Sequence, residues 1–133
     1  MASYSISQPP DVKKIATVTG INAKTTGATT LFTVPTGNTF VCTAVYVRVT
    51  AFTAGGKNQN NNVEVGGNDG VFDNFASESG VGTVALGNVF RIQPAIGEVG
   101  TSYAAGIVFS LNISQASNAS VETWAVDVFG YLI

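Results

Sequence analysis

The sequence predicts an all-β fold: a single antiparallel β-sandwich of the jelly-roll type, preceded by an extended N-terminal arm. Short runs of β-branched and aromatic residues recur along the 133 residues. Glycine, proline and asparagine separate these runs at positions that suit turns. No segment of helical length repeats apolar residues at the 3.6-residue period. Many short strands joined by such turns are typical of sandwiches and jelly rolls.

The arm is expected to span residues 1–13, and the domain residues 14–133. Pro9 and Pro10 disfavour both helix and sheet pairing and favour extended polyproline geometry. An arm of this kind either frays as a free terminus or lies on a neighbouring subunit. It lacks the apolar stretch of a signal peptide.

The first half of the domain is expected to hold three strands. Residues 14–20 are rich in β-branched side chains, and residues 31–34 follow a polar loop. A turn at residues 35–38 leads into a long strand at residues 39–52 (TFVCTAVYVRVTAF). Its Arg48 is either a surface cation or part of an ion pair at an interface. Strict alternation assigns to one face Val41, Thr43, Val45, Val47 and Val49, and to the other Cys42, Ala44, Tyr46, Arg48 and Phe52.

The middle of the chain is expected to be a series of loops and short strands. A polar loop at residues 53–62 should protrude, and residues 62–65 should form a brief strand. Residues 77–82 are predicted to be a turn. Gly87-Asn88 favours a hairpin between short strands at residues 83–86 and 89–92.

Two strands are expected near the C-terminus. Residues 106–114 alternate as a half-buried strand does. Residues 120–133 (SVETWAVDVFGYLI) are apolar on both faces apart from Asp127, which predicts a strand covered on two sides. Trp124 in this strand is expected to fill the core.

The composition argues against catalysis. The chain has no histidine, the commonest general base, and its one cysteine, Cys42, is expected to be a buried core residue. An acid pair for glycoside hydrolysis could come from Asp69, Asp73, Glu78, Glu98 and Glu122, but their spacing indicates no pairing. We therefore expect no enzyme activity and no cofactor.

The charge pattern favours a protein that hides part of its surface in an oligomer. Charged residues make up 11% of the chain, against about 25% in an average domain. A net charge of −2 without a basic run argues against nucleic-acid binding, and no apolar run is long enough to span a membrane. Residues 66–74 (GGNDGVFDN) resemble the oxygen-donor loops that hold calcium, but such residues also make ordinary turns, so no metal site is assigned.

The opening of the domain, IATVTGINAKTTGATTLFTVPTGNTFV (residues 15–41), has a TTG-TTLFTVPTG-TF pattern, and its end, ETWAVDVFGYLI (residues 122–133), has a VDVFGYLI-type close. In these two patterns the chain resembles small proteins of tailed bacteriophages and prophages. Residues 53–106 depart from the pattern. The close is also similar to the last strand of trimeric jelly rolls of the tumour-necrosis-factor type. These resemblances imply a structural virion protein.

Trimeric jelly rolls recur both as capsid decoration proteins and as fibre heads, so the resemblance leaves the two roles open. Of these we expect a capsid decoration (cement) protein: a homotrimer that binds the major capsid protein and stabilises the assembled head shell. It would be made in the host cytoplasm and would lie on the capsid surface. Subunit and shell contacts are expected at Tyr4, Ile6, Pro9, Pro10, Tyr46, Arg48, Phe129, Tyr131 and Ile133. The alternative is a head or tail fibre or spike module that binds host-surface glycan through a loop of Lys57, Asn58, Gln59, Asn60 and Asn61.

Overall fold

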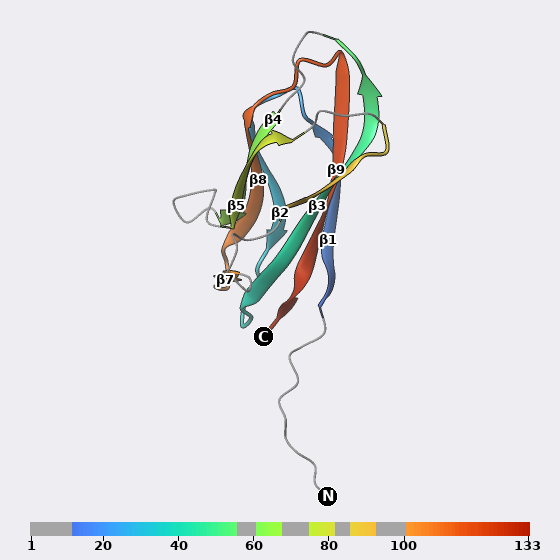
Figure 1. Cartoon of the computed structure of the whole chain (residues 1–133). Coiled ribbons are helices and arrows are strands. Elements are labelled where there is room, and N and C mark those ends of the chain that lie inside the picture. The colour runs from blue at the N-terminus through green and yellow to red at the C-terminus, as the bar shows by residue number, and fades with distance from the viewer. Residues whose placement is uncertain (1–11, 56–60, 68–74, 82–85, 93–100) are drawn as a thin grey trace, which may run out of the picture.

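The computed structural model describes residues 12–55, 61–67, 75–81, 86–92 and 101–133, and these form strands and turns (Figure 1). None of these ranges contains a helix that could cross a membrane. The strands are β1 (Lys13–Asn22), β2 (Gly27–Thr33), β3 (Phe40–Thr53), β4 (Asn61–Gly67), β5 (Ala76–Val81), β6 (Val89–Ile92), β7 (Thr101–Tyr103), β8 (Val108–Gln115) and β9 (Val121–Leu132).

The strands pair into two antiparallel sheets that form the two layers of a sandwich (Figure 1). Sheet A has the order β1-β9-β3-β6, and β7 pairs with β3 beyond the end of β6. Sheet B has the order β2-β8-β4-β5. Most connections cross from one sheet to the other, so the chain wraps around the core as in a jelly roll. The predicted all-β sandwich is confirmed.

The core between the sheets is aromatic at one end. Phe40 and Phe109 are completely buried, and their rings meet edge to face with centroids 5.5 Å apart. Tyr103 packs against Phe109 with a centroid distance of 5.0 Å. Edge-to-face contacts of this kind add to the stabilisation from buried area. Trp124 fills the core toward the other end, and Cys42 is buried, both as expected.

A β-bulge in β3 changes which side chains face the core. The pairing with β9 shifts between Cys42 and Ala44, so Thr43 is an additional residue in β3. Cys42 before the bulge and Val45 after it both belong to the core cluster, whereas Val41 does not. Strict alternation along residues 39–52 was therefore wrong for Val41, Cys42 and Thr43, because it assumed one constant phase. A second shift, between Val49 and Ala51, turns Phe52 toward the core as well, against the prediction.

Two predictions for the middle of the chain are also corrected. The turn predicted at residues 77–82 is wrong, because residues 76–81 form β5 and pair with β4. β6 is a strand as expected, but Leu86 lies in a turn and not in a strand. This turn docks on β3, where the Gly87 amide donates to the Val49 carbonyl at 3.0 Å and the Val49 amide donates to Asn88 at 2.9 Å.

A buried carboxyl group anchors the Trp124 end of the sandwich. Glu122 is 1% exposed; its Oε1 accepts a hydrogen bond from Ser117 Oγ at 2.7 Å, and its Oε2 accepts one from Trp124 Nε1 at 2.8 Å. Burial raises the pKa of Glu122, although both hydrogen bonds oppose this shift by favouring the charged form. The group therefore serves as an acceptor for the indole N–H inside the core.

Asn61 ties the two sheets together beside this carboxyl group. Its Nδ2 donates to Ala23 O at 2.9 Å and to Gln115 O at 3.3 Å. Asn61 and Gln115 belong to sheet B, whereas Ala23 follows β1 of sheet A and its amide donates to Glu122 O at 3.0 Å. The buried Oδ1 of Asn61 has no partner among the described residues. Asn61 thus holds the two sheets together through its amide N–H groups, although leaving its buried Oδ1 unpaired lowers the stability of the fold.

Replacing Glu122 tests this buried cluster. Glu122→Ala should lower the free energy of unfolding by about 2–4 kcal/mol, because it leaves the Trp124 N–H unpaired and opens a cavity. Glu122→Gln keeps the shape and an acceptor. A raised carboxyl pKa stabilises the fold at low pH, and this contribution is lost as pH rises through the folded-state pKa. The free energy of unfolding of the wild type, measured in urea, should therefore fall relative to that of Glu122→Gln as pH rises above about 4.3. If the free energies of unfolding of the wild type and of Glu122→Gln changed with pH in parallel, the raised pKa of Glu122 would be contradicted.

Gly130 of β9 tests the close approach between β9 and β3. A Cβ at Gly130 would overlap the carbonyl oxygen of Val41 and lie 2.7 Å from the Phe40 ring. Gly130→Ala should therefore lower the free energy of unfolding by about 2–3 kcal/mol. At Gly106, where φ is +86° and no atom lies within 4 Å of an added Cβ, alanine should cost about 1 kcal/mol through backbone strain alone. Urea denaturation measures both, and equal losses would refute steric overlap at Gly130.

Candidate interaction surface

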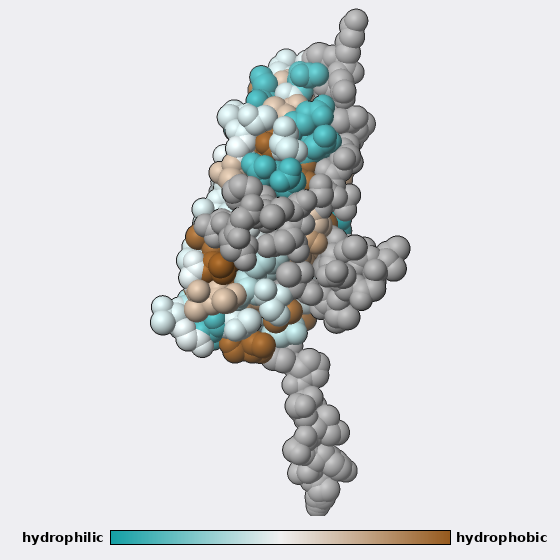
Figure 2. All heavy atoms as spheres, turned by 90° about the vertical axis from the view of Figure 1, so that its left-hand side faces the viewer, coloured by the Kyte–Doolittle hydropathy of each residue, from teal (hydrophilic) through white to brown (hydrophobic). Residues whose placement is uncertain are grey.

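The two outer faces of the sandwich differ in character. Core residues of β4 and β8 alternate with side chains that point outward from sheet B. These outward residues are polar, and they include Asn62, Glu64, Asn112 and Ser114. Figure 2, which looks at the side of the molecule where β5 lies in Figure 1, shows hydrophilic residues gathered on its upper half and hydrophobic residues on part of its lower half. The outward side of β4 and the facing part of β8 thus resemble an ordinary surface in contact with water.

The outer face of sheet A is apolar, aromatic and positively charged. Antiparallel pairing sets its side chains in rows across the strands. One row runs Thr17, Asp127, Tyr46, Arg91 through β1, β9, β3 and β6. A second row joins Lys14 of β1, Phe129 of β9 and Ala44 of β3, and a third joins Ala125 of β9, Arg48 of β3 and Val89 of β6.

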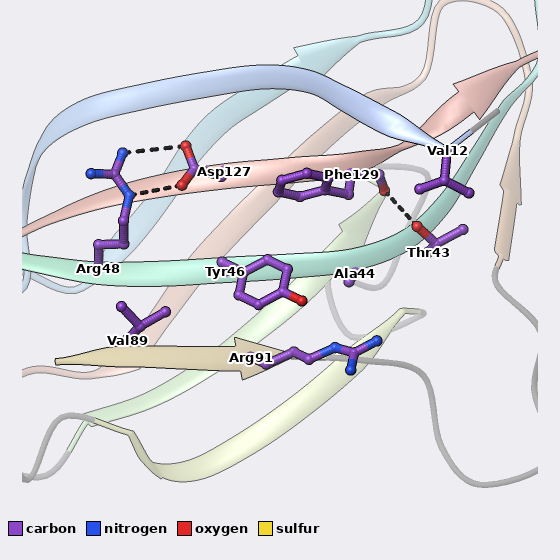
Figure 3. Close-up of a pocket in the computed structure, with 9 residues that line it drawn as sticks. All are labelled: Val12, Thr43, Ala44, Tyr46, Arg48, Val89, Arg91, Asp127 and Phe129. Atoms are coloured by element: carbon purple, nitrogen blue, oxygen red, sulfur yellow. Dashed lines mark hydrogen bonds and ion pairs between the residues drawn. The ribbon is translucent and has the colours of Figure 1, made fainter.

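Between these rows lies a hollow of about 330 Å³, which we call the sheet A hollow (Figure 3). It is lined by Val12, Thr43, Ala44, Tyr46, Arg48, Val89, Arg91, Asp127 and Phe129. Val12, next to the edge strand β1, is 53% exposed, and Val89, in the opposite edge strand β6, is 54% exposed. Apolar side chains of this size are thus left open to solvent beside aromatic rings, which is typical of a surface that binds a partner.

An ion pair occupies one end of the sheet A hollow (Figure 3). Arg48 binds Asp127 through both carboxylate oxygens, with Nε–Oδ2 at 2.7 Å and Nη2–Oδ1 at 3.2 Å. Thr17 Oγ1 donates to Oδ1 at 2.7 Å. Burial by itself raises the pKa of Asp127, but the hydrogen bonds from Arg48 and Thr17 and the charges of Arg48 and Lys14 together hold it below the ordinary value. The charge of Arg48 is thus offset within the chain.

Arg91 has a different environment from Arg48. Its guanidinium lies over the Tyr46 ring at 5.9 Å from the centroid, and the Tyr46 ring meets Phe129 edge to face at 5.3 Å. Among the described residues the ion pair is Arg48–Asp127, and Arg91 has no carboxylate partner. The arrangement can therefore accept an anionic group beside apolar side chains, and the ring contact helps to orient the cation.

The structure brings together three of the predicted contact residues, since Tyr46, Arg48 and Phe129 all line the sheet A hollow. Tyr131 lies farther along β9, half-buried and opposite Val41. Ile133 is 60% exposed, and its backbone pairs with Thr39. The arm residues Tyr4, Ile6, Pro9 and Pro10 lie outside the described residues.

The sequence did not identify Val12, Val89 and Arg91 as residues of this surface. Val89 and Arg91 belong to the short strand β6, and sequence alternation alone does not reveal which strand is its neighbour. Their period-two spacing on opposite sides of Phe90 was the one available signal, because it places both on one face of a strand.

The other candidate sites of the sequence gain no support. Asn61 was predicted to lie in an exposed recognition loop, and this is wrong because it is fully buried and bonded to two carbonyl groups. Lys57, Asn58, Gln59 and Asn60 lie outside the described residues, as do residues 68–74 of the calcium-like segment. Gly66 and Gly67 are buried in β4. No group of three metal-ligating side chains occurs in the described part of the chain.

The candidate acid pairs of the sequence can be traced only in part. Glu122 is committed to Ser117 and Trp124 within the core. Asp69, Asp73 and Glu98 lie outside the described residues, and so does the side chain of Glu78. The geometry of the described residues therefore offers no catalytic pair of carboxyl groups.

The ion pair in the hollow predicts a pH dependence opposite to that of Glu122. A lowered carboxyl pKa stabilises the fold above the unfolded-state value of about 3.9, and this contribution is lost as pH falls through the folded-state pKa. The melting temperature of Asp127→Asn should therefore lie below that of the wild type at pH 7, and the gap should close near pH 2. Thr17→Val, which keeps the ion pair, should show a smaller gap. A gap that does not change with pH would contradict this account.

The comparisons with known proteins concern the fold. No protein-family model matches the chain, and no curated protein matches it. A chain in a solved structure described as the acidic stable capsid structure of Helicobacter pylori bacteriophage KHP30 is similar, with a TM-score of 0.54 and 14% sequence identity. The similarity covers 92% of this chain and 97% of that chain. At this level of identity, the likeness supports the β-sandwich fold.

Proposed function

We propose that this chain is a structural protein of a bacteriophage virion, a decoration protein that binds the assembled head shell and stabilises it. The observation that carries the proposal is the fold likeness to a chain of a phage capsid structure over nearly the full length of both chains. The bacteriophage-type patterns at residues 15–41 and 122–133 point in the same direction.

The contrast between the two outer faces supports a role in which one face is covered. Sheet B presents polar residues outward, whereas sheet A presents exposed valines, two aromatic rings and a hollow. Apolar patches on soluble proteins mark sites of interaction. A sandwich with one polar outer face and one apolar outer face suits a protein that lies on a larger assembly.

We further propose that the chain acts as a homotrimer on the capsid surface and has no enzymatic activity. In a closed ring each contact joins two different surfaces of the subunit, so no surface has to match itself. Tyr131 and the exposed Ile133 at the end of β9, together with the arm residues Tyr4, Ile6, Pro9 and Pro10, are the proposed contacts. The major capsid protein is the proposed shell partner.

Particles assembled without this chain provide the test of shell stabilisation. They should release their DNA at a lower temperature than complete particles, and added purified protein should restore the higher temperature, because a ligand that binds only the intact shell stabilises it. Dye access to DNA during heating measures the release. Equal release temperatures with and without the protein would refute a stabilising role.

A second measurement addresses the trimer and the fibre alternative. Sedimentation at micromolar concentration should give the mass of three copies, and a monomer would contradict the proposed assembly. A glycan array should show no specific binding, whereas strong binding to a host glycan would favour the fibre or spike module. One of the five residues proposed to bind glycan, Asn61, is buried and therefore not accessible to a glycan.

A further inference from the structure

The described charges on the outer face of sheet A leave a positive excess. Lys14, Arg48 and Arg91 lie on this face together with one acid, Asp127. The acid is bound by Arg48, so the charges that remain belong to Lys14 and Arg91. The whole chain has a net charge of −2, so this face is opposite in sign to the molecule that carries it. Charge of this sign beside apolar side chains favours an acidic partner.

The surroundings of Arg91 prepare it for a carboxylate. The Tyr46 ring contacts the guanidinium, and the ring is itself braced by Phe129. Val89, two residues before Arg91 on the same face of β6, is 54% exposed. A cation held in place beside an open apolar surface loses little freedom when it binds an anion, so the contact retains more of its free energy.

We propose that the sheet A hollow is the docking site for an acidic segment of a shell protein. A carboxylate of that segment pairs with Arg91, and successive apolar side chains of the segment pack against Val89, Phe129 and Val12 across the hollow. This inference rests on the proposed function, because it takes the shell as the source of the segment. It adds which face meets the shell and which chemistry the shell must present.

Charge complementarity separates this partner from two others. A second copy docking face to face would bring together two surfaces that carry the same positive excess, and like charges across an interface oppose binding. A nucleic acid requires a run of cations along its phosphates. The hollow instead holds a carboxylate, Asp127, and its remaining lining is largely apolar.

The test is binding of the purified full chain to shells that lack it, measured by co-sedimentation. Arg91→Glu should weaken binding by at least about tenfold, and Val89→Asp, which adds an acid to the hollow, should do the same. Lys24→Glu is the matched control, because it makes the same charge change at an exposed site beyond the end of β1 and should alter binding less than about twofold. Melting curves establish that each variant is folded.

The chemistry of the partner is tested by converting the carboxylates of the shells to amides with carbodiimide and methylamine. This treatment should abolish most of the binding of the wild type. If Arg91→Glu and Val89→Asp bind shells as well as Lys24→Glu does, the inference is overturned and the proposed function still stands. Failure of the wild type to bind any shell would overturn both. Binding to a DNA duplex as tight as binding to shells would show phosphate as the ligand and overturn the acidic protein partner.

Discussion

The structure depends on the pairing of β9 between β1 and β3 at the centre of sheet A. Because successive side chains of a strand point to opposite faces, the register of β9 decides at once what enters the core and what reaches the surface. Trp124 and Glu122 point inward, whereas Asp127 and Phe129 point outward. A slip of one residue would bury Asp127 in the core and expose Val128, so this register is strongly fixed.

Strand pairing also places the two bonded carboxyl groups of β9 on opposite faces of the strand. The inner face of β9 carries the acid that satisfies the Trp124 N–H, and its outer face carries the acid that binds Arg48. The inner carboxyl group is favoured in its neutral form by burial, and the outer one is kept charged by its partners. One strand therefore holds two carboxyl groups in opposite environments, one on each face of sheet A.

The sequence predicted the fold class because runs of β-branched and aromatic residues alternate with turn residues and no segment keeps a helical period. It placed Cys42 in the core because no histidine is present to give the thiol a catalytic role, although strict alternation put Cys42 on the face of Arg48. It failed where pairing overrides local signals. β5 forms from residues with turn-like composition because β4 supplies a partner, and Asn61 is buried because carbonyl groups from both sheets converge on its amide. Tyr46, Arg48 and Phe129 of the hollow were predicted as contact residues. Arg91 was not, because it joins Tyr46 only through the pairing of β6 with β3.

The bulge at Thr43 has a consequence for how this domain tolerates change. The hydroxyl of Thr43 donates to the Phe129 carbonyl at 3.2 Å, which helps to fix the additional residue in place. Thr43 and Ala44 both face the outside of sheet A, so removing Thr43 would leave a regular ladder with Cys42 and Val45 still in the core. Removing one of the regularly paired residues of β3 would instead exchange inside for outside beyond that point. In the course of divergence, β3 should therefore lose a residue at Thr43 more readily than at its regularly paired positions.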